Sequence, residues 1–294
     1  MKARVPTRGP FSFYKKWEMK IAIQGEIGCF HELAARQYFH NHKIDIVACS
    51  TFDMTLQAVK DKDADYALMA VENARAGSIL YNYTLIRESG MKVLGEHNLR
   101  VKQNLMALPG QTITDIKEIR SHPIALSQCM TFLNQYPEIT LIESDDTAGS
   151  ARIIKQNNLK GVAAIASSNA AAIYDLEIIA PGIETYKMNY TKFVIVGDRD
   201  IENKTGNKAS ICFSVKHDTG MLAAVLVKLA EMGINLTKIQ SVPNMTDRWG
   251  YMFYLDLELP KNSKTEAISN ELSKYTIGLE ILGIYNKGEE LYES

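Results

Sequence analysis

The stretch Asp198–Lys208, DRDIENKTGNK, divides the sequence into two parts with different patterns. It is polar and shows no apolar period, which is typical of a linker. In residues 20–197, short apolar runs alternate with segments of helical period. In residues 209–294, six elements follow one another as strand, helix, strand, strand, helix and strand. We therefore expect a larger α/β domain, a linker at 198–208 and a smaller second domain.

The element order of residues 209–294 is that of a ferredoxin-like βαββαβ fold. The polar stretch Asn244–Gly250 lies between the two central strands and suits a hairpin loop. Strands are expected at residues 209–215, 235–242, 251–259 and 279–285, and helices at residues 221–232 and 265–274.

The alternation in residues 20–197 predicts mostly parallel sheets covered by helices, as one sheet or as two lobes. Ligands of such folds bind at the carboxyl ends of strands, beside helix N-termini. Polar residues at these points are therefore candidates for a site. Strands are expected at residues 20–24, 45–49, 66–71, 91–94, 105–108, 139–142, 162–166 and 191–196. Helices are expected at residues 32–39, 51–60 with Ser50 as N-cap, 80–88, 123–136 with Pro123 in the first turn, 147–156 and 169–174.

Composition excludes several classes of protein. A net charge of −1 and a pI of about 6.6 over 294 residues give no basis for binding nucleic acid. No apolar run approaches the roughly 18 residues of a membrane span, so no membrane partner is expected. Residues 1–19 lack the apolar core of a secretory signal, and we interpret them as an extension, with Met19 as an alternative start. Four cysteines without metal spacing indicate the cytoplasm, and six scattered histidines indicate no metal site.

Polar clusters lie at the predicted strand ends and helix starts, where free helix N–H groups favour small anions. Any one cluster is also explained by helix caps and turns, because Ser, Thr, Asp and Asn are common at both. The clusters are Gly25–His31 (GEIGCFH), Glu72–Ser78 (ENARAGS), Ser121–Pro123 (SHP), Asp145–Ala148 (DDTA), Ser167–Asn169 (SSN) and Asn189–Phe193 (NYTKF).

Two residues in these clusters have both a catalytic and a structural interpretation. Cys29 is either a thiol nucleophile or a small residue in a tight turn. His122, which precedes Pro123, is either a general base or the residue that fixes the start of the following helix. The sequence contains no GxSxG, HExxH, P-loop or GxGxxG motif.

Taken together and in this order, the clusters resemble the motifs of the prephenate dehydratase family, from about Lys20 to Tyr285. The resemblance implies a two-lobed, periplasmic-binding-protein-like catalytic region, with one lobe of residues 20–100 and 190–197 and another of residues 101–189. The family's Gly-Pro-x-Gly-Thr-Phe-Ser is similar to Gly25–His31, its Pro-Ile-Glu-Asn-Ser-x-x-Gly to Ala70–Gly77, its Ser-His-Pro-x-Ala-x-x-Gln-Cys to Ser121–Cys129, its Ser-Thr-Ala to Asp146–Ala148, and its Asn-x-Thr-Arg-Phe to Asn189–Phe193.

The resemblance also implies a reaction. The family converts prephenate to phenylpyruvate, with loss of water and carbon dioxide, in L-phenylalanine biosynthesis. Because the product ring is aromatic, no electron sink is needed, and neither cofactor nor metal is expected. Thr191 is expected to donate a hydrogen bond to the departing hydroxyl. The implied catalytic residues are Thr191, Lys192 and Phe193, and the implied substrate-binding residues are Gly28, Cys29, Phe30, Glu72, Asn73, Ala74, Thr147 and Asn189.

Four of the departures from the family pattern bear on the expected site. Lys192 replaces Arg, which matters if the Arg grips a carboxylate with two N–H groups but is mild if it belongs to a structural ion pair. Cys29 replaces Thr and Ala74 replaces Ser, so two hydroxyl groups are absent from the expected pocket. His31 replaces Ser and adds a titratable group.

The part after the linker resembles an ACT domain. Its segment Gly220–Leu222 is similar to the family's Gly-Ala-Leu, and Asn235–Pro243 to its Asn-Leu-Thr-Lys-Ile-Glu-Ser-Arg-Pro. In the family this domain binds phenylalanine between paired subunits and inhibits catalysis, which implies a homodimer or homotetramer. Gln240 for Glu and Val242 for Arg remove two charges and leave phenylalanine control open. The implied effector residues are Gly220, Met221, Leu222, Asn235, Leu236, Gln240, Ser241 and Pro243.

Two alternatives remain at this point. An arogenate dehydratase would need an acidic partner for the ammonium group of arogenate. A non-enzymatic, amino-acid-responsive binding or regulatory protein would account for the altered residues Cys29, Ala74 and Lys192, whereas Thr191 and its neighbours favour an enzyme.

Overall fold

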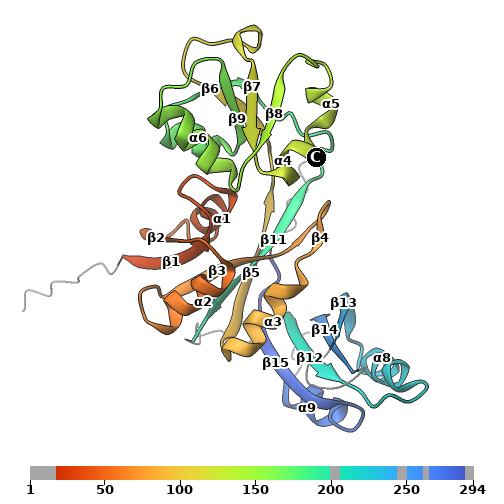
Figure 1. Ribbon diagram of the computed structural model, residues 1–294. Coiled ribbons are helices and arrows are strands. Elements are labelled where there is room, and N and C mark those ends of the chain that lie inside the picture. Colours follow the sequence, from red (N-terminus) through yellow and green to blue (C-terminus); the bar gives the residue numbers. More distant parts are fainter. Residues whose placement is uncertain (1–17, 199–205, 244–249, 261–264, 289–294) are drawn as a thin grey trace, which may run out of the picture.

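The computed structural model describes residues 18–198, 206–243, 250–260 and 265–288, and it contains three separate β-sheets. Two sheets form lobes stacked one above the other, and the third lies beside the lower lobe (Figure 1). Most of the predicted extension and linker, and all of the predicted hairpin loop except Gly250, lie outside the described residues.

The first lobe is built on a sheet of order β2-β1-β3-β11-β5, with β4 paired to β3. Strand β1 runs parallel to β2 and β3, whereas β11 is antiparallel to both of its neighbours. The strands are β1 (Met19–Gln24), β2 (Ile44–Cys49), β3 (Tyr66–Asn73), β4 (Gly77–Ser78), β5 (Lys92–Arg100) and β11 (Tyr190–Gly197), and the helices are α1 (Phe30–Tyr38), α2 (Phe52–Lys60) and α3 (Leu80–Ser89).

The second lobe is inserted between β5 and β11, on a sheet of order β10-β6-β9-β7-β8. Because β5 and β11 are hydrogen-bonded neighbours, the chain leaves the first lobe and returns to it at one place. This two-lobed α/β arrangement confirms the predicted fold class. The expectation of mostly parallel sheets was wrong, because β11 is antiparallel to both of its neighbours in the first sheet and β6 to both of its neighbours in the second. The elements are β6 (Asn104–Ala107), a 3-10 turn at Ile113–Asp115, β7 (Glu118–Ser121), α4 (Pro123–Gln128), α5 (Met130–Leu133), β8 (Thr140–Glu143), α6 (Thr147–Gln156), β9 (Val162–Ala166), α7 (Ser168–Ile173) and β10 (Glu177–Ala180).

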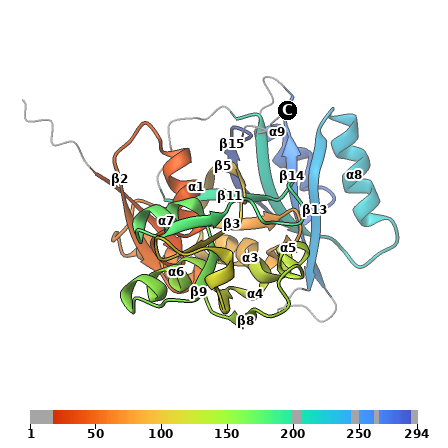
Figure 2. The same cartoon turned by 90° about the horizontal axis from the view of Figure 1, so that it is seen from above.

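The C-terminal unit has the predicted βαββαβ order, on a sheet of order β13-β14-β12-β15. It lies next to the first lobe in Figure 1, and the view from above shows it to one side of the two stacked lobes (Figure 2). Its strand β15 packs so closely on β5 that only glycine fits at position 283. A Cβ there would lie 2.0 Å from the Val93 carbonyl oxygen. The elements are β12 (Lys208–Ser214), α8 (Met221–Glu231), β13 (Asn235–Pro243), β14 (Tyr251–Glu258), α9 (Thr265–Leu272) and β15 (Ile277–Tyr285).

A buried charge cluster joins the C-terminal unit to the first lobe. The last residue of the predicted linker, Lys208, is the first residue of β12, and it is fully buried. Its ammonium pairs with Glu96 of β5 and lies 4.0 Å from Asp256 of β14. Ser210 donates to the Asp256 carboxylate at 2.6 Å. The paired charges and hydrogen bonds let these polar groups remain in the interior.

Several local predictions were wrong. The helix expected at residues 123–136 is two short helices, because Cys129 has non-helical backbone angles (φ −106°, ψ 7°). The N-cap of α2 is Thr51 rather than Ser50, and its side chain accepts from the Met54 N–H at 3.3 Å. Strands β4, β7 and β10 were not predicted, and β5 extends beyond residue 94. Polar residues interrupt the apolar runs of β5 and β7, and β4 and β10 are only two and four residues long.

Candidate active site

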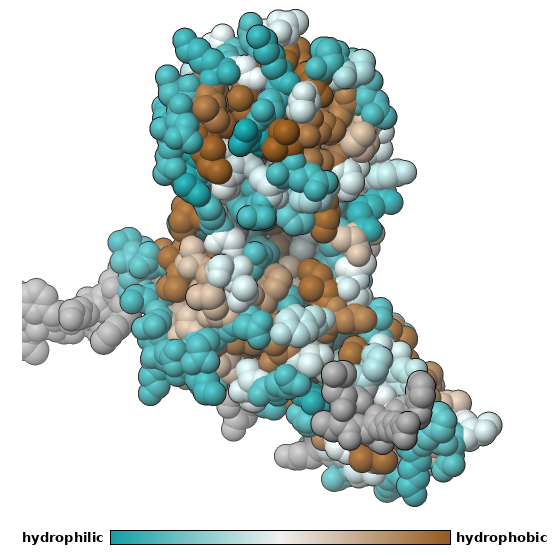
Figure 3. All heavy atoms as spheres, in the orientation of Figure 1, coloured by the Kyte–Doolittle hydropathy of each residue, from teal (hydrophilic) through white to brown (hydrophobic). Residues whose placement is uncertain are grey.

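A cavity of about 250 Å³ lies where the two lobes meet, and both lobes contribute to its wall. The space-filling view shows the narrow waist between the lobes (Figure 3). The first lobe contributes the ends of β1, β3 and the start of β11, and the second lobe contributes the starts of α4 and α6. The lining residues are Gln24, Cys29, Phe30, His31, Ala70, Asn73, Ala76, Ile79, Val101, Gln103, His122, Ile124, Ala125, Gln128, Asp145, Asp146, Thr147, Thr191 and Phe193.

Thr191 is held at this cavity by Asn73, its cross-strand partner in the β3–β11 ladder. The Asn73 Oδ1 accepts from the backbone N–H groups of Arg75 and Ala76, at 2.9 and 2.8 Å. These two bonds fix the orientation of the amide, so its Nδ2 donates to Thr191 Oγ1 at 2.8 Å. Because Oγ1 accepts from Asn73, the Thr191 hydroxyl hydrogen is left to donate to a ligand.

The hydrogen-bond network continues from Asn73 into the second lobe. Asn73 Nδ2 also lies 3.1 Å from Asn189 Oδ1, and Asn189 Nδ2 donates to Gln128 Oε1 at 3.0 Å. Gln103 Nε2 donates to the same oxygen at 3.2 Å, and Gln103 is buried. A chain of side-chain amides therefore ties Thr191 of β11 to α4 and positions it relative to both lobes.

Three helix N-termini reach the cavity and provide positive potential in place of cationic side chains. Of the described residues that line the cavity, none is Lys or Arg. The N-cap of α1 is Cys29, whose side chain makes no capping bond, so N–H groups of the first turn stay available. Helix α4 is capped by His122, whose Nδ1 accepts from the Ile124 N–H at 3.2 Å, in line with its structural interpretation.

Two acidic residues also line the cavity, at the start of α6. Asp146 caps this helix, since its Oδ1 accepts from the Gly149 N–H at 2.7 Å. Burial raises the pKa of Asp146. Asp145 is exposed at the cavity mouth. These carboxyl groups are the only acidic side chains among the described residues that line the cavity, and they are suitable partners for a cationic group of a ligand.

Contacts between the lobes hold the cavity together. Arg152 of α6 binds Glu26 through two N–H groups, at 2.5 and 2.9 Å, and this hydrogen bonding lowers the pKa of Glu26. Ser167 Oγ donates to the Gly28 carbonyl oxygen at 2.6 Å. Gly28 therefore positions the loop before α1 and does not itself line the cavity.

The titratable groups on the first-lobe wall are uncharged near neutral pH. Burial raises the pKa of the Cys29 thiol to about 12, which favours the structural interpretation over the nucleophile. Burial also lowers the pKa of His31 to about 4, so its imidazole is neutral. The His31 ring meets Phe193 edge-on, with a distance of 5.0 Å between the ring centres.

The structure brings only some of the predicted residues together. Cys29, Phe30, Asn73, Thr147, Thr191 and Phe193 line the cavity, whereas Gly28, Glu72, Ala74, Asn189 and Lys192 do not. Lys192 instead binds Glu72 at 3.3 Å, as expected of a structural ion pair. Sequence reasoning missed Gln24 and Gln103, which no motif marks. It also missed Gln128, although this residue lies within the quoted Ser121–Cys129 segment.

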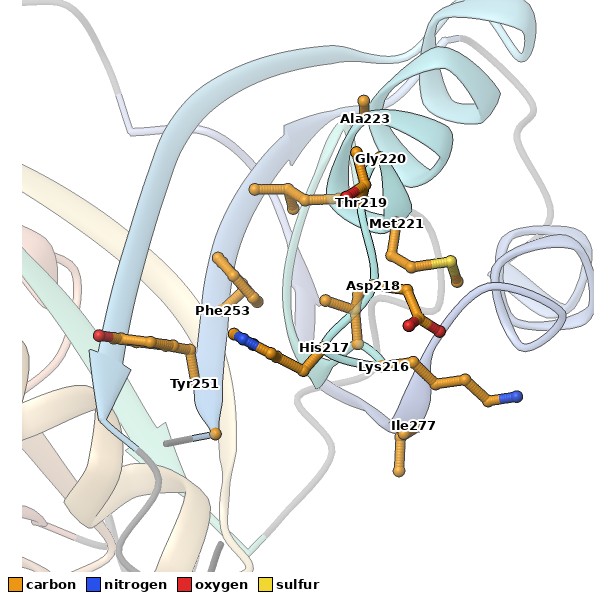
Figure 4. Close-up of a pocket in the computed structure, with 13 residues that line it drawn as sticks. Lys216, His217, Asp218, Thr219, Gly220, Met221, Ala223, Tyr251, Phe253 and Ile277 are labelled. Atoms are coloured by element: carbon orange, nitrogen blue, oxygen red, sulfur yellow. The ribbon is translucent and has the colours of Figure 1, made fainter. Parts of the chain in front are cut away.

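A second pocket, of about 820 Å³, lies in the C-terminal unit between the loop after β12, the start of α8 and β14 (Figure 4). Of the predicted effector residues, Gly220, Met221 and Leu222 line it. The other five, Asn235, Leu236, Gln240, Ser241 and Pro243, lie on β13 and do not.

In residues 18–198, 206–243, 250–260 and 265–288, no three His, Cys, Asp or Glu residues are grouped as metal ligands. None of the helices in these ranges has the length and apolar character to span a bilayer.

Known proteins are similar to this chain in both sequence and fold. The family model described as prephenate dehydratase matches residues 21–201. The chain belongs to the prephenate dehydratase family. It is 35% identical over 285 residues to arogenate dehydratase 3, chloroplastic, of Arabidopsis thaliana, a match that covers 91% of this chain and 67% of that protein. It is 33% identical over 272 residues to the bifunctional chorismate mutase/prephenate dehydratase of Aquifex aeolicus, covering 92% and 74%.

Solved structures extend the match across both parts of this family member. GqqA, described as a novel type of quorum quenching acylase, has a TM-score of 0.82 at 31% identity and covers 90% of this chain and 97% of its own. The prephenate dehydratase of Arthrobacter aurescens in complex with L-Phe also has a TM-score of 0.82, at 23% identity, covering 91% and 90%. At that identity the second likeness concerns the fold alone.

Proposed function

We propose that this protein is a prephenate dehydratase. The observation that carries the proposal is the orientation of Thr191, whose Oγ1 accepts from Asn73 at 2.8 Å and whose hydroxyl hydrogen is left to donate into the cavity. A preoriented donor of this kind suits a reaction in which negative charge develops on a departing oxygen.

The reaction needs little from the protein beyond orientation and this donor. The bond to the ring carboxylate breaks as carbon dioxide forms, and its electron pair completes the aromatic ring. The C–O bond breaks at the same time, and the departing hydroxide takes up a proton to become water. Thr191 is too weak an acid to be ionised, but its hydrogen bond stabilises the charge on that oxygen. Such a donor contributes about 2.7–4 kcal/mol in other enzymes, and orientation between the lobes supplies much of the remainder.

The walls of the cavity match the other groups of prephenate. Its two carboxylates suit the helix N-termini, which offer N–H groups without a cationic side chain. The apolar surfaces of Phe30, Ile79 and Phe193 suit the ring. A carboxylate held against an apolar wall is poorly solvated, and poor solvation favours its loss as neutral carbon dioxide.

The direct test is turnover by the purified protein. We expect prephenate to be converted to phenylpyruvate in the presence of a metal chelator and without added nucleotide, as followed by chromatography of both compounds. Binding of prephenate without turnover would refute the proposal and favour the non-enzymatic alternative.

Arogenate is a second candidate substrate, and Asp145 and Asp146 favour it. Arogenate carries an ammonium group where prephenate has a keto oxygen, and these carboxyl groups line the same cavity. Parallel measurements of kcat/KM for the two substrates decide between them. If either acid binds the ammonium, Asp145→Asn or Asp146→Asn lowers kcat/KM for arogenate more than for prephenate.

The C-terminal unit is proposed to be an ACT-type sensor that binds L-phenylalanine. The pocket beside Gly220 supports this assignment, because it combines helix N–H groups of α8 with the apolar side chains of Met221 and Phe253. Since the predicted effector residues on β13 lie elsewhere, we propose that a second copy completes the site in a homodimer or homotetramer. The four described cysteines are free and buried thiols, which supports the cytoplasm as the compartment.

A further inference from the structure

The ladder of β3 and β11 has two faces with different partners. Asn73 and Thr191 are cross-strand partners that face the cavity. The adjacent pair, Glu72 and Lys192, is also a cross-strand pair but does not line the cavity. Because side chains alternate along a strand, this ion pair lies directly behind the catalytic pair. A displacement of Glu72 therefore also moves the segment of β3 and β11 that positions Thr191.

A lysine of the C-terminal unit approaches this ion pair on the face of the sheet that is turned away from the cavity. Lys238 of β13 is 8% exposed, and its Nζ lies 4.0 Å from Glu72 Oε2, the oxygen that also binds Lys192. The same ammonium lies 3.7 Å from the centre of the Tyr83 ring in α3. Among the described residues, no acceptor forms a hydrogen bond with Lys238 Nζ. A buried cation without an acceptor is costly, so its position near Glu72 calls for a reason beyond packing.

A second contact from the same strand reaches the same hairpin. Gln240 Nε2 donates to Ser78 Oγ at 3.2 Å, and Ser78 is the β4 partner of Glu72. Val242, two residues further along β13, packs on the same core as Tyr83. One face of β13 therefore contacts the β3–β4 hairpin at both of its strands, and the hairpin carries Asn73 at its end.

We propose that Lys238 is a positioning residue for catalysis. Its ammonium and that of Lys192 both attract the Glu72 carboxylate. This attraction fixes the β3–β11 segment that orients Asn73 and Thr191. The proposal rests on the proposed dehydratase function and adds the route by which the C-terminal unit acts on the cavity. Occupancy of that unit would change turnover by moving β13, because Lys238 and Gln240 move with the strand.

The surroundings of Lys238 make its charge sensitive to pH. Burial lowers the pKa of Lys238 to about 8, against the opposing effect of Asp256 and Glu72. The ammonium is therefore present below about pH 8 and lost above it. Tyr83 and Cys212 do not titrate there, because burial raises the pKa of Tyr83 well above its usual range and that of Cys212 to about 12. The charged or titratable groups that face Lys238 are Glu72 of β3, Tyr83 of α3, Lys192 of β11, Lys208 of β12 and Asp256 of β14.

Three forms of the full-length protein test the proposal through kcat as a function of pH. In the wild type, kcat falls as the pH rises through about 8. Lys238→Met removes the charge, so kcat is already lower at pH 7, by about two- to thirtyfold, and shows no step near pH 8. Lys238→Arg keeps a cation that stays protonated as the pH rises through 8, so kcat there stays near the pH 7 wild-type value. KM changes little, because Lys238 does not line the cavity.

A matched variant and a second readout separate this proposal from general damage. Lys228→Met removes an ammonium from exposed α8, where it pairs with Glu231 and Glu271, and it keeps the wild-type profile. Amide hydrogen exchange of residues 72–78 rises in Lys238→Met but not in Lys228→Met, whether or not the enzyme turns over. A wild type that converts neither prephenate nor arogenate defeats the proposed function alone. Unchanged exchange, or a step at pH 8 that survives in Lys238→Met, defeats the role of Lys238.

Discussion

The cavity between the lobes and the pocket of the C-terminal unit are assembled in different ways. Around the cavity, segments that are more than 100 residues apart in sequence meet within one chain, as shown by the bond between Asn73 and Thr191. Around the second pocket, Gly220 and its neighbours are present, but the other motif of that unit lies apart on β13. The difference teaches that motif residues share a site only where the topology of the chain brings them together.

The largest effect is expected at the complete site. Thr191→Ala removes the hydroxyl that Asn73 orients, and kcat for prephenate should fall by about 10²–10³-fold, as for loss of other donors to a developing oxyanion. Steady-state kinetics measure this loss, and circular dichroism checks that the fold is retained. Thr191→Ser is the matched control, since it keeps the hydroxyl and should retain more activity than the alanine variant. A Thr191→Ala enzyme within a few fold of wild type would mean that the cavity is not where the two lobes perform the chemistry.

An intermediate effect is expected from a substitution in the second pocket. It should change inhibition by L-phenylalanine and leave the catalytic step unchanged. Gly220 has a φ of +84°, in the left-handed region that other residues occupy at a cost of about 1–2 kcal/mol. Gly220→Ala should therefore lower the free energy of unfolding by that amount and weaken inhibition by L-phenylalanine. Urea unfolding and inhibition curves measure the two changes.

A second glycine of the same unit provides the control for that experiment. Gly233 follows α8 with a φ of +70° and lies outside the pocket. Gly233→Ala should cost similar stability and leave the inhibition curve unchanged. Equal loss of inhibition in both variants would show that strain in the unit, rather than the pocket beside Gly220, governs the response.

The two regions also differ in how much of them could be predicted from the sequence. Local periodicity predicted the βαββαβ order and the strand–helix alternation, because apolar runs mark buried elements. It failed where burial depends on a partner distant in the sequence: the expected strand stopped at residue 94, yet β5 continues through Glu96, which Lys208 neutralises inside the protein. The cavity residue Gln103 carried no signal for the same reason, since its role depends on an amide of the other segment, Gln128.

The smallest effect is expected from a reagent aimed at the cavity itself. With a pKa of about 12, Cys29 is a thiolate in about one molecule in ten thousand at pH 8, and only the thiolate reacts with iodoacetamide. Cys29 is also only 3% exposed, so its thiol is accessible to the reagent only when the lobes move apart. We therefore expect native protein to keep its activity during alkylation at pH 8, while mass spectrometry of urea-unfolded protein shows all four cysteines modified. Rapid inactivation that tracks modification of Cys29 would instead mean that the thiol is ionised. The catalytic character of the cavity would then come from sulfur as well as from the amides and the hydroxyl around Thr191.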